Sequence, residues 1–155
     1  MITIITGNIN TRKTTKTIEH YERNHQGDGF VSLKLMTNDS VDHYEMIKLS
    51  TQEKKILMIH KQSILIDKFM SLDIGPYHVL KQTVLWVEEE IKQMIKMNVS
   101  PIYLDEIGVL ELKNEGFHHI LITLLEANLD LVLVVRDGLR QEVISKYHMK
   151  NICLL

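Results

Sequence analysis

Residues 2–15, ITIITGNINTRKTT, decide the fold that this sequence can adopt. The stretch opens on five consecutive β-branched residues, 2–6, and such a run predicts a buried strand. Gly7 ends the run, and a helical pattern begins six residues later with Lys13 and Thr14. A strand that passes through a short loop into a helix points the free backbone N–H groups of that helix toward the loop. These residues therefore predict an α/β unit with an anion site at its turn.

The spacing within this turn is that of the phosphate-binding P-loop, G-x-x-x-x-G-K-[ST], with one departure. Gly7, Lys13 and Thr14 stand at their expected positions, but Arg12 occupies the position of the second glycine. Glycine at such positions adopts dihedral angles that cost other residues of order 1–2 kcal/mol. Arg12 can instead turn its guanidinium toward the phosphates and supply positive charge. The motif is consistent with both a working and an impaired loop.

The composition is that of a small globular protein. A chain of 155 residues suits a single domain, which we expect to span residues 1–155. The net charge of −2 gives no electrostatic case for nucleic acid or an anionic membrane as the main partner. The lone Cys153 excludes a disulfide framework and fits a reducing cytosol, and no apolar run is long enough to span a membrane. We expect a cytoplasmic protein.

Along the chain, helical and strand patterns alternate after an antiparallel section. We expect helices over residues 14–25, 77–97, 117–125 and 139–147, and strands over residues 2–6, 30–36, 44–49, 55–60, 102–106, 131–135 and 152–155. Alternation of helix and strand implies crossover connections and parallel pairing. The predicted fold is α/β, a three-layer sandwich with a mainly parallel sheet and a small antiparallel insertion.

Three of the predicted strands end in residues that suit phosphate chemistry, and ligands of open α/β sheets bind beyond such ends. At the first, Lys13 is placed to reach the terminal phosphates and the Thr14 hydroxyl to bind Mg²⁺. At the second, Asp105 offers Mg²⁺ a hard oxygen ligand, and Glu106 can orient or deprotonate an attacking water. At the third, Arg136 can stabilise charge on a transferred phosphoryl group.

Each of these features also has an ordinary structural explanation, because Lys-Thr turns, acidic strand ends and arginines at helix starts are common on protein surfaces. Their occurrence in this order, at three strand ends of one sheet, is what indicates a phosphate site. Other sites have weaker signals: the eight histidines lack the spacing of metal ligands, and no serine or cysteine lies in a nucleophile elbow.

With these strand ends in place, the chain resembles the small P-loop nucleoside-triphosphatase (NTPase) family. The resemblance is clearest over residues 102–112, IYLDEIGVLEL, which are similar to the family segment IDEIG-x-x-EL. Residues 2–15 are similar to its P-loop start, and residues 75–79, GPYHV, to its G-x-Y-x-V stretch. Residues 134–137, VVRD, lie where the family has a strand followed by an arginine.

The resemblance implies a RecA-like α/β sandwich that hydrolyses several nucleoside triphosphates slowly with Mg²⁺. It assigns phosphate and metal binding to Lys13 and Thr14, metal binding to Asp105 and water activation to Glu106. The catalytic candidates are thus Glu106, Lys13 and Arg136, and the metal ligands Thr14 and Asp105. The candidates for binding the nucleotide are Gly7, Asn8, Ile9, Asn10, Thr11, Arg12, Lys13, Thr14 and Thr15.

Three functions remain open from the sequence. The first is hydrolysis of the β–γ bond of ATP or GTP, which intact Lys13, Thr14, Asp105 and Glu106 favour. The second is a P-loop relative without catalysis that serves as a regulatory or interaction module, which Arg12 and the glycine-poor loop favour. The third, a small-molecule or nucleotide kinase, is disfavoured because no arginine for a phosphate-covering lid lies between the predicted first helix and the third strand end. The sequence holds no signal for the oligomeric state.

Overall fold

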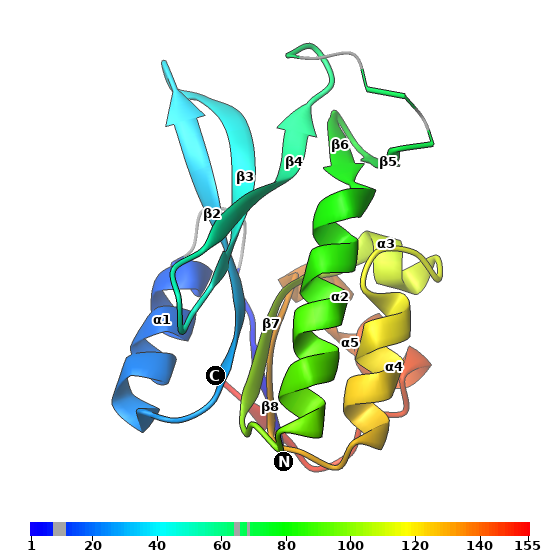
Figure 1. The fold of residues 1–155 in the computed structure, drawn as a ribbon. Helices are drawn as coiled ribbons and strands as arrows, with labels where there is room; N and C mark the ends of the chain where they lie inside the picture. The colour runs from blue at the N-terminus through cyan, green and yellow to red at the C-terminus, as the bar shows by residue number, and fades with distance from the viewer. Residues whose placement is uncertain (8–11, 64–65, 68) are drawn as a thin grey trace.

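The computed structural model describes residues 1–7, 12–63, 66–67 and 69–155, and within these ranges nine strands form a single sheet (Figure 1). The strands are β1 Ile2–Ile5, β2 Asp28–Thr37, β3 Ser40–Lys48, β4 Lys54–His60, β5 Ser71–Ile74, β6 Tyr77–Leu80, β7 Ile102–Ile107, β8 Leu131–Val135 and β9 Ile152–Leu154. The helices are α1 Lys13–Asn24, α2 Lys81–Lys96, α3 Val109–Leu112, α4 His118–Glu126 and α5 Arg140–Lys146, with a 3-10 turn at Asp137–Leu139. No helix in the described ranges is long and apolar enough to cross a membrane.

Helices cover both faces of the sheet, which gives the predicted three layers. On one face, α1 packs its Ile18 and Tyr21 against buried residues of the sheet such as Ile5 and Val132. On the other face, α2, α4 and α5 pack into the larger hydrophobic core. Figure 1 shows α2 and α4 side by side over β7 and β8. The α/β fold class and the sandwich architecture are confirmed.

The sheet consists of two halves that differ in strand direction. Its order is β5-β6-β4-β3-β2-β7-β8-β1-β9. We call β7, β8, β1 and β9 the parallel half and β2 to β6 the antiparallel half. Of the adjacent pairs among the described strands, four are parallel and four are antiparallel. The prediction of a mainly parallel sheet with a small insertion was therefore partly wrong, because antiparallel pairing accounts for half of the pairs.

Burial explains why the parallel half was easy to predict. All five residues of β8 are buried, and Ile4 and Ile5 of its neighbour β1 are 0% exposed. Strands covered by helices on both faces are nearly continuous apolar runs, and such runs stand out in a sequence. β1 pairs with β8 from Ile2 opposite Leu131 to Ile5 opposite Val134, so the loop after β1 begins level with the end of β8.

The segment 77–97 was predicted as one helix, and this was wrong at its start. Tyr77–Leu80 is strand β6, which pairs with β5 and β4, and α2 begins only at Lys81. Gly75, with φ +51°, lies in the tight turn between β5 and β6. The apolar residues of β6 continue into the apolar stripe of α2, so periodicity alone did not show where the strand ends and the helix begins.

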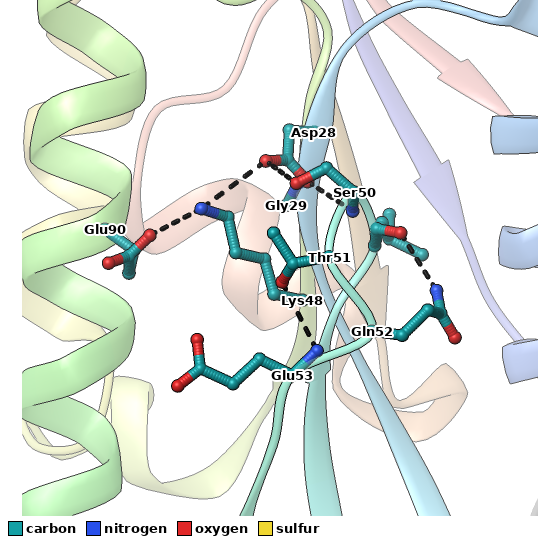
Figure 2. A network of polar contacts seen from close by, with 9 residues as sticks. Asp28, Gly29, Lys48, Ser50, Thr51, Gln52, Glu53 and Glu90 are labelled. Atoms are coloured by element: carbon teal, nitrogen blue, oxygen red, sulfur yellow. Dashed lines mark hydrogen bonds and ion pairs between the residues drawn. The ribbon is translucent and has the colours of Figure 1, made fainter.

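A partly buried polar network fastens the antiparallel half to α2 (Figure 2). Lys48, at the end of β3, donates a hydrogen bond to Glu90 of α2 with an Nζ–Oε2 distance of 2.6 Å. The same ammonium lies 3.8 Å from a carboxylate oxygen of Asp28, at the start of β2. Asp28 in turn accepts hydrogen bonds from the Ser50 hydroxyl at 2.6 Å and from the Gly29 backbone at 2.8 Å. The network therefore fixes both β2 and β3 relative to the helix.

Candidate functional site

A cavity of about 710 Å³ lies at the carboxyl ends of the parallel strands. Its lining includes Lys13 and Thr14 at the start of α1, Asp105 and Glu106 at the end of β7, and Arg136 directly after β8. The structure thus brings five of the residues singled out in the sequence, from three separate segments, into one cavity. Small-molecule sites commonly have volumes of about 300–1,000 Å³, so this cavity is large enough for a nucleotide.

The first turn of α1 opens toward this cavity without a side-chain cap. Arg12 is its N-cap, and within the described residues it makes no capping hydrogen bond with its side chain. No acidic residue lies in the first turn, so its backbone N–H groups and the positive end of the helix dipole are available to an anion. The Arg12 backbone has φ −75°, outside the left-handed region that favours glycine. The strain expected from replacing that glycine is therefore absent at Arg12.

The other loop candidates differ from Lys13 and Thr14 in that the described ones do not line the cavity. Gly7 is half-buried and follows β1, and Arg12 and Thr15 are exposed; none of these three residues contributes to the cavity lining. Four candidates lie outside the described residues: Asn8, Ile9, Asn10 and Thr11.

Asp105 is held rigidly at the bottom of the site. Its side chain is 5% exposed, and each carboxylate oxygen accepts a backbone hydrogen bond. Oδ2 accepts from the N–H of Ser32 at 2.9 Å, and Oδ1 accepts from the N–H of Glu106 at 2.6 Å. Burial raises the pKa of Asp105, and the neighbouring Glu106 raises it further. A nearby cation would therefore stabilise the ionised form of the Asp105 carboxyl.

Glu106 is turned out of the regular strand. Its φ is +68°, an unusual value for a residue with a side chain, and the pairing of β7 with β8 shifts between Leu104 and Ile107. Such irregularities redirect side chains and recur at functional sites. Burial raises the pKa of Glu106, whereas Lys13 and Arg136 lower it. The two cations therefore lie close enough to favour the ionised carboxylate.

Ser32 of β2 also lines the cavity, and no motif in the sequence pointed to it. It is 3% exposed. Its backbone N–H donates to Asp105, and its carbonyl oxygen accepts a hydrogen bond from the Thr14 hydroxyl at 2.8 Å. Ser32 therefore connects the start of α1 with the end of β7. Only the pairing of β2 with β7 brings it there, and no local motif encodes that pairing.

A largely apolar wall of the cavity comes from the antiparallel half. Tyr44 of β3 and Tyr77 of β6 meet edge to face there, with ring centroids 5.5 Å apart. Burial raises the pKa of Tyr44 to about 12, and Tyr77 and Glu106 add to the rise. Tyr44 thus stays neutral at physiological pH. Gly75 and Pro76 of the β5–β6 turn complete this wall, so the GPYHV segment lies at the cavity.

Arg136 lies at the mouth of the cavity. Its side chain is exposed, and its backbone N–H donates to the Ile107 carbonyl oxygen at 3.3 Å, which joins the ends of β8 and β7. Arg140, the second arginine after β8, does not contribute to the cavity lining. Within the described chain, no group of three or more His, Cys, Asp or Glu side chains could hold a metal ion by itself.

Two solved structures share this fold. THEP1 from the hyperthermophile Aquifex aeolicus superposes with a TM-score of 0.70 at 20% identity, covering 100% of this chain and 88% of that chain. A human cancer-related nucleoside triphosphatase has a TM-score of 0.63 at 18% identity, covering 99% of this chain and 86% of its own. At these identities the likeness establishes the fold alone. The search of curated proteins gave no match.

The sequence itself provides the assignment to a family. The family model described as NTPase matches residues 2–154, which is nearly the whole chain. This span includes the loop after β1, the acidic end of β7 and Arg136. The chain belongs to the NTPase family.

Proposed function

We propose that this protein binds a nucleoside triphosphate, ATP or GTP, in the cavity and hydrolyses it slowly to the diphosphate and phosphate with Mg²⁺. One observation carries the proposal: Lys13, Thr14, Asp105, Glu106 and Arg136 line a single cavity. Membership of the NTPase family supports it. We infer a cytoplasmic location from the single cysteine. The net charge of −2 argues against nucleic acid as a partner.

The phosphates are placed at the start of α1. There the uncapped N–H groups and the Lys13 ammonium attract the polyphosphate. We assign phosphate binding to the whole loop, that is to Gly7, Asn8, Ile9, Asn10, Thr11, Arg12, Lys13, Thr14 and Thr15. The nucleotide then lies with its terminal phosphate toward Glu106, because Lys13 reaches the terminal phosphates in such sites.

The residues present fit a Mg²⁺ ion. Thr14 and Asp105 offer hydroxyl and carboxylate oxygens, which are the donors that Mg²⁺ prefers. The Thr14 hydroxyl donates a hydrogen bond to the carbonyl oxygen of Ser32. The lone pairs of the hydroxyl oxygen are therefore free to bind a cation. Bound Mg²⁺ supplies positive charge that offsets the charge of the phosphate oxygens. Because the described residues hold no larger ligand cluster, its remaining ligands would be phosphate oxygens and water.

The side chains divide the hydrolytic step among them. The Glu106 carboxylate accepts a proton from water as the water oxygen attacks the γ-phosphorus. The bond from that phosphorus to the bridging oxygen breaks, and the diphosphate leaves with the electron pair. Lys13 and Arg136 stabilise the charge that develops on the transferred group and the leaving oxygen. Burial raises the pKa of Glu106, which makes the carboxylate a stronger base.

The direct test measures phosphate release from each nucleoside triphosphate with Mg²⁺. We expect release by the native protein and its loss in Lys13→Ala. Lys16→Ala is the matched control, because Lys16 is exposed on the same helix and does not line the cavity. Equal rates for the native protein and Lys13→Ala would overturn the proposal.

The second candidate function is a non-catalytic relative that retains the fold. It is favoured by Arg12 at the position of a P-loop glycine. The negative φ of Arg12 argues against it, since glycine would relieve no left-handed strain there. Arg12→Gly separates the two: we expect no gain in triphosphate affinity for a working enzyme. A tenfold gain would mark the native loop as impaired and favour the non-catalytic function.

A further inference from the structure

The hydroxyl of Ser32 lies in the lining of the cavity, and the proposed reaction gives it no role. Two buried side-chain polar atoms in the described chain have no hydrogen-bond partner: Ser32 Oγ and Arg140 Nε. Of the two residues, only Ser32 lines the cavity. A buried hydroxyl without a partner is destabilising, so proteins seldom retain one unless a ligand or water forms a hydrogen bond with it.

The position of Ser32 is fixed by contacts other than its hydroxyl. Its backbone N–H is bound to Asp105 at 2.9 Å, and its carbonyl oxygen is bound to Thr14 at 2.8 Å. The two residues assigned to Mg²⁺ therefore hold Ser32 between them. With the backbone anchored on both sides and the side chain 3% exposed, the hydroxyl has little freedom to move away from the site.

Glu106 lines the same cavity as Ser32 and directly follows Asp105, whose carboxylate accepts a hydrogen bond from the Ser32 N–H at 2.9 Å. The unpartnered oxygen therefore belongs to a residue of the cavity lining that is bound to the strand end carrying Glu106. A water there can bond to both side chains and present a lone pair to phosphorus.

We propose that the Ser32 hydroxyl binds the attacking water together with Glu106. The proposal rests on the proposed hydrolysis. One O–H of the water donates to Glu106, which takes that proton, and the other O–H donates to Ser32 Oγ. The serine forms and breaks no covalent bond. It restricts the orientation of the water, and such alignment of reacting groups strongly affects rate.

The test compares rate, affinity and stability in Ser32→Ala. We expect kcat for phosphate release to fall by about tenfold to a hundredfold. KM and the dissociation constant for a non-hydrolysable triphosphate should change by less than about threefold, because Ser32 does not contact the bound phosphates in this assignment. The midpoint of unfolding should not fall, since the hydroxyl has no partner to lose.

Three further variants separate a water-binding role from a structural one. Ser32→Thr restores a hydroxyl on a residue that suits a strand, and we expect it to recover most of kcat. In a Glu106→Gln background, Ser32→Ala should have little further effect, because both groups act on one water. Ser71→Ala is the matched control: Ser71 is a buried strand serine outside the cavity, with its hydroxyl 3.3 Å from His78 Nδ1. It should leave kcat unchanged.

The outcomes are distinct. Native kcat in Ser32→Ala would overturn the proposal. A fall in kcat matched by lower affinity or a lower unfolding midpoint would also overturn it, as would full additivity with Glu106→Gln. Absence of hydrolysis by the native protein would overturn the proposed function itself, and this is seen before any Ser32 variant is made.

Discussion

The parallel and antiparallel halves of the sheet contribute different parts of the site. The parallel half carries the start of α1, Asp105, Glu106 and Arg136, and its central strand β8 is buried throughout. The antiparallel half supplies Ser32 and the tyrosine wall, and the far end of β2 is largely exposed. Charged groups thus stand on strands covered by helices, whereas the wall of the cavity stands on strands that are open to solvent. The charged groups of the site therefore lie on the half whose central strand is buried on both faces.

The halves join where β2 meets β7, and only a short parallel ladder connects them. Gly29 pairs with Tyr103 in this ladder and has φ +150°. A Cβ at Gly29 would lie 2.1 Å from the carbonyl oxygen of Tyr103, so the two backbones approach more closely than any side chain permits. The position of Ser32 beside Asp105 depends on this approach.

The substitution expected to disrupt the junction of the two halves most strongly is therefore Gly29→Ala. The clash is with backbone and the dihedral angle is unfavourable, so we expect a loss of about 4–5 kcal/mol in the free energy of unfolding, at the extreme of single substitutions. Denaturant unfolding measures it. Gly75→Ala is the matched control, because Gly75 also has positive φ but nothing lies within 4 Å of its added Cβ. A loss at Gly29 no larger than at Gly75 would show that the junction is not tight.

The parallel half can be tested at its functional end with Glu106→Gln. We expect kcat to fall by about 10²–10⁴, as for loss of a general base. The free energy of unfolding should stay equal or rise, because burying a neutral amide costs less than burying a charged carboxylate. That same cost raises the pKa of the Glu106 carboxyl. Steady-state phosphate release and thermal unfolding measure the two effects. Retained activity would remove Glu106 from the mechanism.

The smallest change in the free energy of unfolding is expected from the contacts that fasten the antiparallel half to α2. Lys48→Met removes the contacts to Glu90 and Asp28, and we expect it to lower the free energy of unfolding by about 1–2 kcal/mol. Lys92→Met is the control, since Lys92 makes only an exposed pair with Glu89 among the described residues. Equal stability for the two variants would show that the network in Figure 2 does not fasten the antiparallel half to α2.

The sequence predicted what local pattern encodes. The Lys13-Thr14 turn and the Asp105-Glu106 strand end each follow an apolar strand, so a motif and a periodicity place them together. Their meeting in one cavity followed from the rule that ligands bind beyond the carboxyl ends of parallel strands.

What the sequence did not predict depends on distant pairing or on backbone conformation. Ser32 lies 73 residues from Asp105, and only the pairing of β2 with β7 brings the two together. The strand β6 was hidden because its apolar residues run without a break into α2. The positive φ of Glu106 comes from a register shift against β8, which its residue type does not reveal.

The central claim is that residues of three segments form one triphosphate site, and calorimetric titration tests it most directly. A non-hydrolysable triphosphate with Mg²⁺ is titrated into the native protein, Lys13→Ala, Asp105→Asn and Lys16→Ala. We predict saturable binding by the native protein and by Lys16→Ala, with affinity at least about tenfold weaker in the other two variants. No binding by the native protein at millimolar concentrations, or equal affinity in Lys13→Ala, would contradict the claim.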